Sequence, residues 1–329
     1  MIEYIIKRFF SSVIMLLLLS IIVFAMAQLP PGDFADRLSF MLKTEGVTVT
    51  ESDMANLRHR LGLDKPWHIQ YFYWMRNIIL RGDFGISFKY REPVLKVIGE
   101  RVTLTAVMTL GTIITIYFLA IPLGIFSALN QYSLGDHLAT VLGYIGLCIP
   151  NFILALILMY FSSTYLDISA GLFSPEYLTS SWSWGRVLDL LKHIWIPIVV
   201  LAASGIAFRM RTMRATLLDE KQKLYVTAAR AKGLSERKLI MKYPVRIAIN
   251  PIVSTLGWEL TRVISNSPIV TTVLSISVMG PLYLAALLDQ DVYLSSTFLL
   301  LYSVLIVVGT FISDVLLAIL DPRVRRGVS

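Results

Sequence analysis

The sequence predicts an all-α integral membrane protein with six transmembrane helices, and three observations lead to this fold class. Of the 329 residues, 56% are hydrophobic and only 16% are charged, whereas about a quarter of the residues of a soluble domain carry a charge. Uncharged runs of about 20 residues, long enough to cross a bilayer as a helix, recur along the chain. Lysine and arginine gather between these runs, so the net charge of +8 indicates membrane topology rather than nucleic-acid binding.

Five of the six predicted spans are uncharged runs of different lengths. Four of these runs are long, at residues 9–29, 102–135, 138–166 and 292–313. The other run, at 194–208, is the fourth span along the chain and is too short to cross a bilayer by itself. We therefore expect its helix to extend on both sides, through His193 and Arg209.

The fifth span along the chain, at 247–288, is interrupted by Glu259 and Arg262. Their i,i+3 spacing places the two side chains on one face of a helix, where they can pair. Because an unpaired charge inside a membrane is costly, Glu259 and Arg262 are a candidate intramembrane pair. This pair could hold the helices together, or it could contact the solute directly.

The first span is expected to remain in the mature protein rather than be cleaved as a signal peptide. Its uncharged run is longer than the apolar stretch of a signal peptide, which is about 7–15 residues. The sequence then divides into a first transmembrane helix at 1–29, a helical outer (periplasmic) insertion at 30–101 and a core of five transmembrane helices at 102–329.

Basic residues orient the spans. The segment 209–246 carries eleven Lys and Arg against three acids, and further bases flank the first and last spans, namely Lys7, Arg8, Arg323, Arg325 and Arg326. The positive-inside rule places these three segments in the cytoplasm. Both termini and the loop at 209–247 are therefore predicted to be cytoplasmic.

The outer insertion has helix signals of its own. Thr50 and Asp53 are spaced as a capping box, and Gly62 is placed to end the helix that follows. Residues 67–80 are rich in Trp and Tyr, which suits a helix at the membrane surface, although a solvated helix has the same pattern.

The cytoplasmic loop is predicted to contain two short helices. The first covers 221–232 and ends at Gly233, whose missing Cβ permits a left-handed cap. On a helical wheel one side of it carries small and apolar residues, namely Leu224, Tyr225, Ala228 and Ala231, and the other side carries Lys223, Thr227 and Arg230. The second helix starts near Glu236 and has Leu239, Ile240 and Tyr243 on its apolar face. Such helices could dock on a protein partner or lie on anionic lipid.

Three motifs resemble those of one family, and together they extend over nearly the whole chain. Residues 225–236 (YVTAARAKGLSE) resemble the cytoplasmic coupling loop of type I ABC importer permeases, in the form seen in the dipeptide, oligopeptide and nickel permease family. The segment after the first span is similar too, at Leu61-Gly62-Leu63-Asp64-Lys65-Pro66, Gln70-Tyr71, Trp74 and Gly82-Asp83-Phe84-Gly85-x-Ser87. A closing motif follows the last span, with Asp314 and Leu320-Asp321-Pro322-Arg323-x-Arg325.

The resemblance implies a permease subunit that forms the translocation path of an importer in the cytoplasmic (inner) membrane of a bacterium or archaeon. Its partners would be a second permease, as a heterodimer, nucleotide-binding ATPase subunits and an extracytoplasmic solute-binding protein. ATP and Mg would be bound by the ATPase subunits, and this chain would need no cofactor. Coupling to the ATPase would fall on Tyr225, Ala228, Ala229, Arg230, Lys232 and Gly233.

The chain departs from the family pattern in two places. Thr227 stands at the position of the acidic residue from which the family's coupling loop takes its name. Thr271 stands where span five of the family usually carries a glutamate. Neutral hydrogen-bonding residues of span five are candidates for the translocation path, although they could equally pack against other helices: Ser265, Asn266, Ser267, Thr271 and Thr272. With the glutamate missing, the cargo is expected to be an oligopeptide or an oligosaccharide.

The sequence contains no motif of the enzyme or metal-site classes that we considered. No phosphate-binding loop G-x-x-x-x-G-K-[ST], no HExxH, no CxxC and no G-x-S-x-G occurs, and Cys148 is the one cysteine. We therefore expect neither catalysis nor a metal site in this chain. A self-sufficient secondary transporter is the alternative, but that class predicts internal repeats, and residues 1–165 and 166–329 show none.

Overall fold

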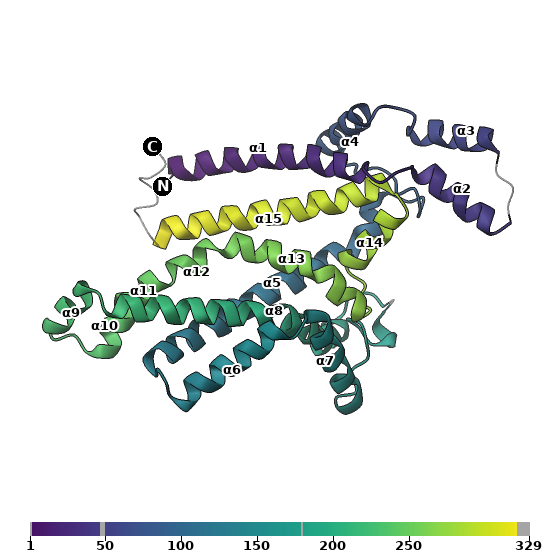
Figure 1. The fold of residues 1–329 in the computed structure, drawn as a ribbon. Coiled ribbons are helices and arrows are strands. Elements are labelled where there is room, and N and C mark those ends of the chain that lie inside the picture. Colours follow the sequence, from purple (N-terminus) through teal and green to yellow (C-terminus); the bar gives the residue numbers. More distant parts are fainter. Residues whose placement is uncertain (1, 47–49, 179, 321–329) are drawn as a thin grey trace. The chain divides into compact units, whose positions relative to one another are not determined.

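The computed structural model describes residues 2–46, 50–178 and 180–320, and these are almost entirely helical (Figure 1). Its contacts divide the chain into two compact units. Unit 1 comprises Met1–Phe10, Ala106–Ile276 and Val308–Ser329, and unit 2 comprises Ser11–Thr105 and Ser277–Val307. The closing motif from Asp321 onward lies outside the described residues.

Within the described residues, four helices are long and apolar enough to cross a membrane. They are α1 (Ile2–Ala27), α5 (Val94–Leu129), α8 (Trp184–Lys221) and α15 (Val292–Leu320). A fifth candidate is the bent pair α6 (Leu134–Cys148) and α7 (Asn151–Tyr165). The predicted count of six is not confirmed, because α13 (Leu256–Val273) does not meet the same criteria. Its charges, Glu259 and Arg262, and its polar run 265–267 lower its hydropathy.

The uncharged run 138–166 is not one continuous helix, contrary to the simplest interpretation of its length. The chain turns by 107° between α6 and α7. Pro150 has no backbone N–H to donate, and its ring pushes Ile149 out of the helical region, to φ −81° and ψ 121°. The break therefore has a local cause.

The run 102–135 is likewise divided, by the turn between α5 and α6. Ser133 caps α6 by accepting the backbone N–H of Asp136. The buried Asp136 carboxylate accepts hydrogen bonds from the hydroxyl of Ser127, the backbone N–H of Tyr132 (2.9 Å) and the guanidinium of Arg214 on α8 (2.9 Å). These contacts fix the turn to α8.

The predicted extension of the short fourth span is confirmed, because α8 runs through His193 and Arg209 for 38 residues. Ser183 caps its N-terminus by accepting from the backbone N–H of Arg186 (3.3 Å). The last turns of α8 reach the short helices that follow, namely α9 (Leu224–Ala231), α10 (Glu236–Lys242), α11 (Pro244–Ala248) and α12 (Asn250–Ser254).

Unit 2 contains three short helices of the insertion and the short apolar helix α14 (Met279–Leu288). The insertion helices are α2 (Phe34–Thr44), α3 (Glu51–Leu61) and α4 (Trp67–Arg81). The predicted capping box of Thr50 and Asp53 is present at the start of α3, and Gly62 ends that helix at φ 69°. On α4, Trp74 is buried beside Phe24 and Phe88 in the core of this unit.

Candidate functional site

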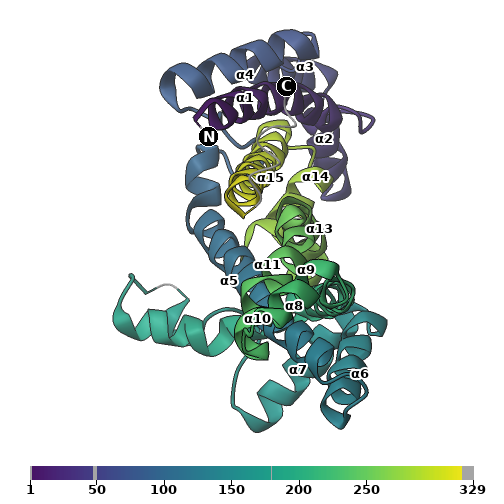
Figure 2. The same ribbon diagram turned by 90° about the vertical axis from the view of Figure 1, so that its left-hand side faces the viewer.

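The predicted cytoplasmic segment forms two short helices, α9 and α10, at the C-terminal end of α8 (Figure 1). Figure 2 looks onto this end of unit 1 and shows α9 and α10 beside α8 and α11. The first helix is shorter than expected, because Lys221 ends α8 and α9 begins at Leu224. Gly233 follows α9 with φ 79°, in the left-handed region as predicted.

One face of α9 holds the helix to unit 1. Val226 is fully buried and Ala229 is 9% exposed, and both belong to a core cluster with residues of α5, α8, α10, α11 and α12, among them Met213, Leu217 and Leu239. On α10, Leu239 and Ile240 are buried, as the sequence predicted for its apolar face. The buried side of each helix therefore anchors the pair to the rest of unit 1.

The opposite face of α9 is open. Leu224 is 87% exposed, and Ala228 and Ala231 are exposed as well. These are three of the four residues that the helical wheel grouped as a docking face, while Tyr225 is half-buried. An exposed leucine flanked by alanines is a small apolar surface that a partner can approach closely.

The six residues assigned to coupling thus occupy different surroundings. Tyr225 donates its hydroxyl hydrogen to Glu220 (2.7 Å), and burial, together with this carboxylate, raises the pKa of the phenol. Ala229 faces the protein interior, whereas Ala228, Lys232 and Gly233 are exposed.

Arg230 closes the turn between α9 and α10. Its guanidinium donates two hydrogen bonds to Glu236, Nε to Oε2 at 3.0 Å and Nη2 to Oε1 at 2.7 Å. The hydrogen bond to Glu236 raises the pKa of Arg230, and the same bond lowers the pKa of Glu236. Both side chains are exposed, so the pair sets the geometry of the turn more than its stability.

The predicted pair of Glu259 and Arg262 is present, and it has a third member. Arg262 donates from both Nε and Nη2 to Glu259 Oε1, with the Nε contact at 3.0 Å. Arg209 on α8 donates to the other carboxylate oxygen at 2.7 Å. The side chains of Arg209 and Glu259 are 3% and 2% exposed. The sequence did not reveal Arg209 as a partner, because it lies 50 residues away on another helix.

Two small residues of α8 make room for this charge cluster. A Cβ on Gly205 would lie 2.5 Å from Arg262 Nη2 and 2.7 Å from Glu259 Oε1. Ser204 accepts a third hydrogen bond from Arg262, at 2.6 Å. The cluster therefore fixes α13 against α8 through hydrogen bonds between side chains of the two helices.

The five candidate path residues of α13 fall into two groups. Ser265, Asn266 and Thr272 are exposed, and Ser267 and Thr271 are buried. Thr271 donates to the backbone carbonyl of Ser267 at 2.8 Å, and Thr272 donates to that of Pro268, also at 2.8 Å. The buried pair is therefore placed to pack within unit 1, whereas the exposed three present polar groups on the outside of this chain.

Among the described residues, no group of three or more His, Cys, Asp and Glu side chains could hold a metal ion. The charged cluster on α13 consists of hydrogen-bonded ions, and α9 offers a surface of small apolar residues.

Two family models cover most of the chain. Residues 120–326 match the family described as "Binding-protein-dependent transport system inner membrane component". Residues 1–109 match the N-terminal family of the same membrane components. The first match contains the charged cluster, helices α9 and α10 and the candidate path residues of α13.

Three relatives match this chain over nearly their whole length. The oligopeptide transport system permease protein AppB of Bacillus subtilis is 30% identical over 326 residues, covering 99% of this chain and 100% of its own. A putative peptide permease protein of Brucella ovis is 29% identical over 328 residues, and the glutathione transport system permease protein GsiC of Salmonella typhimurium is 28% identical over 325 residues, each covering 99% of both chains. The chain belongs to the family of inner membrane components of binding-protein-dependent transport systems, the permease subunits of type I ABC importers.

Proposed function

We propose that this chain forms half of the translocation path of an ATP-driven peptide importer and receives the conformational change through α9. ATPase subunits would dock on the open face of α9 and move it when they bind ATP. A second permease would complete the path, and a solute-binding protein would deliver cargo on the other side. In this arrangement both termini and the α9–α10 segment are cytoplasmic, as the distribution of Lys and Arg indicates.

The observation that carries the proposal is the contrast between the two faces of α9. Val226 and Ala229 are buried in the core of unit 1, while Leu224 is 87% exposed. Because α9 is packed against unit 1 on one side, a movement of a partner bound at Leu224 and Ala228 would move α8 and α11 together with α9. A loop without this packing would bend and would not transmit the movement. An amphipathic helix lying on lipid is the competing interpretation for the same face.

A cross-linking experiment separates the two interpretations. Ala228→Cys in a Cys148→Ala background is labelled with a short reagent that reacts with the thiol at one end and carries a photoreactive group at the other, and the sample is illuminated together with the co-expressed ATPase subunits. Docking predicts a cross-link between permease and ATPase whose yield changes with ATP. A helix on lipid would give no such product, and this result would overturn the proposal.

For the cargo we propose a peptide. The relatives reported above are named for oligopeptide, peptide and glutathione transport, and none of the three is named for a sugar. The oligosaccharide alternative has no such support. The neutral side chains exposed on α13, Ser265, Asn266 and Thr272, suit hydrogen bonds to a peptide backbone, which is polar and uncharged.

A further inference from the structure

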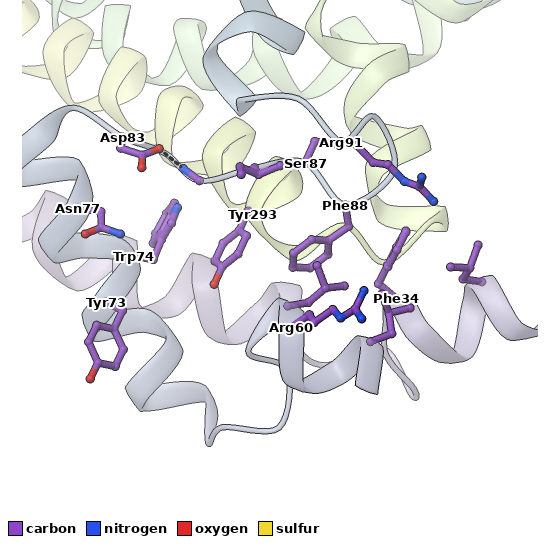
Figure 3. A pocket seen from close by; sticks show the side chains of 15 residues that line it. Phe34, Arg60, Tyr73, Trp74, Asn77, Asp83, Ser87, Phe88, Arg91 and Tyr293 are labelled. Atoms are coloured by element: carbon purple, nitrogen blue, oxygen red, sulfur yellow. Dashed lines mark hydrogen bonds between the residues drawn. The ribbon is translucent and has the colours of Figure 1, made fainter. Parts of the chain in front are cut away.

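Helix α4 of the insertion carries large apolar residues on both of its sides. The inner side is packed in unit 2, where Gln70 and Trp74 are buried. A cavity of unit 2 also lies against α4, and Tyr73, Trp74 and Asn77 line it (Figure 3). A surface helix that buries one side normally exposes polar residues on the other, and α4 does not follow this pattern.

The outer side of α4 is open and apolar. At 3.6 residues per turn, four large side chains lie on the side of the helix opposite Trp74. Their exposed fractions range from 37% to 69%, and they are Ile69, Phe72, Ile79 and Leu80. Arg76 lies among them and is exposed as well. An apolar surface of this kind indicates contact with a partner or with lipid.

Contacts with α1 set the level of α4 along that candidate membrane span. The hydroxyl groups of Tyr71 and Ser20 share a hydrogen bond of 2.8 Å, and Gln28 donates its side-chain amide to Gln70 at 3.1 Å. Ser20 lies seven residues before Ala27, the last residue of α1, and Gln28 directly follows it. Seven residues of helix extend over about 10 Å. Helix α4 is therefore level with the last two turns of α1.

The direction of α4 is also that of a helix at a membrane surface. Figure 1 shows α1 along its length and α4 foreshortened, whereas Figure 2, turned by 90°, shows α4 along its length. Because α1 is long and apolar enough to cross a membrane, a helix that runs across its last turns lies close to the plane of the membrane surface. Interfacial helices in this place bury their apolar side about 5–10 Å into the boundary between headgroups and acyl chains.

The charges of α4 match a phospholipid surface. From Trp67 to Arg81 the helix carries the basic residues His68, Arg76 and Arg81 and no acidic residue. Long basic side chains reach lipid phosphates while their apolar neighbours enter the acyl layer. A solute-binding protein could also cover an apolar side, but the level of α4 beside the end of α1 is where lipid surrounds a membrane span.

We propose that α4 lies in the outer leaflet of the membrane, with Ile69, Phe72, Ile79 and Leu80 among the upper acyl chains and Arg76 at the phosphate of an anionic phospholipid. The sequence alone was equally compatible with a solvated helix. The proposal goes beyond the proposed function, because this contact with lipid needs neither ATP, nor peptide, nor the binding protein.

Fluorescence quenching in vesicles tests the position of α4. Phe72→Cys and Ile79→Cys, each in a Cys148→Ala background with cysteine-free partner subunits, are labelled with bimane. The complex is reconstituted in equal parts of phosphatidylglycerol and phosphatidylcholine. A lipid nitroxide at acyl carbon 5 should quench both labels more than one at carbon 12, and aqueous iodide should quench them little. Two positions are used so that a folding defect in one variant does not decide the result.

Phe40→Cys is the matched control, because Phe40 is 65% exposed and Phe72 is 63% exposed. Phe40 is on α2, which lies beyond the end of α1 in Figure 1, so iodide and not the lipid nitroxides should quench its label. The proposal is wrong if iodide quenches the labels on α4 as strongly as the label at Phe40, because α4 then lies in water. Shielding from iodide only after the binding protein is added would assign the apolar side to that protein. Labels that neither quencher reaches would show that another subunit covers α4.

The role of Arg76 is tested with the nitroxide at carbon 5 on one of the two lipids at a time. Phosphatidylglycerol should be enriched about fivefold over phosphatidylcholine near the label at Phe72, the effect of one base beside an anionic lipid. Arg76→Gln should remove this preference, and Arg60→Gln, which changes an exposed arginine on α3, should keep it. Equal quenching by the two lipids in the protein with Arg76, or an equal loss in both variants, would overturn the assignment of Arg76 to a lipid phosphate.

Discussion

Arg209 on α8 donates a hydrogen bond of 2.7 Å to Glu259 on α13, and both side chains are almost fully buried. The second oxygen of Glu259 is bound by Arg262, three residues along the same helix. One carboxylate thus neutralises two guanidiniums only in part, and the cluster keeps a net charge of +1. Glu259 is therefore the group on which both arginines depend.

Removing Glu259 alone should be the most destabilising change in this cluster. Glu259→Ala leaves Arg209 buried without a counter-ion, and loss of a buried partner costs about 3–5 kcal/mol. The double change Glu259→Ala with Arg209→Ala should recover part of this loss, because no buried charge remains unpaired. The thermal midpoint of the detergent-purified protein measures both effects.

Arg262 supplies the comparison for that experiment. It is partly exposed and also donates to Ser204, so Glu259→Ala with Arg262→Ala should recover less stability than the double change with Arg209. If the two double variants are equally stable, the burial of Arg209 is not what makes Glu259 necessary.

Gly233 should be needed for its backbone conformation and not for space. Its φ is 79°, and no atom lies within 4 Å of the position of a Cβ. Gly233→Leu should therefore strain the turn by about 1–2 kcal/mol and lower uptake per ATP hydrolysed. Gly233→Asn should be better tolerated, because asparagine enters the left-handed region more readily. Equal defects in the two variants would show that the side chain, and not the turn, is responsible.

The contact between α2 and α3 should weaken in acid. Burial raises the pKa of Asp33, but the hydrogen bonds from Arg58 and from the backbone N–H of Asp36 outweigh it, so the pKa lies below the ordinary value of 3.8. Because the folded pKa is the lower one, the stabilisation is complete above about pH 4 and is lost as the pH falls through the folded value. An ion pair this exposed contributes about 0.2–1 kcal/mol.

Hydrogen exchange of the α2 and α3 amides at pH 3 and pH 6 measures that change. Asp33→Asn keeps an oxygen for the helix cap but removes the charge, so the variant should exchange faster than the unchanged protein at pH 6, and the difference should shrink at pH 3. A difference of the same size at both pH values would assign the effect to the cap instead of the charge.

Cysteine replacement should divide the candidate path residues as their burial does. In a Cys148→Ala background, cysteines at Ser265, Asn266 and Thr272 should react with a membrane-impermeant thiol reagent, and peptide should slow the reaction. A cysteine at Ser267 or Thr271 should remain unreactive, because both positions are buried. Uniform reactivity at all five positions, or none, would contradict the placement of the path on the exposed side of α13.

Local chemistry made several features predictable from sequence. The capping box of Thr50 and Asp53, the left-handed caps at Gly62 and Gly233 and the i,i+3 contact of Glu259 with Arg262 each depend on residues a few positions apart. The extension of the fourth span followed in the same way from the length that a membrane requires.

Features that depend on distant residues were not predictable. Arg209 has the sequence surroundings of any basic residue at the end of a span, and only the packing of α8 on α13 brings it to Glu259. Ala229 matches the coupling motif, yet the fold turns it inward beside Val226. The break at Pro150 could have been predicted from its chemistry, but the long uncharged run around it suggested an unbroken span.

The central claim is that the exposed face of α9 couples this permease to an ATPase, and ATP-driven peptide uptake by the reconstituted importer tests it most directly. Leu224→Glu should abolish uptake and co-purification of the ATPase subunits while the thermal midpoint stays unchanged, because Leu224 is 87% exposed. The matched control is Leu134→Glu on α6, where the leucine is 82% exposed but lies outside the coupling segment. Normal uptake in Leu224→Glu, or an equal loss in Leu134→Glu, would contradict the claim.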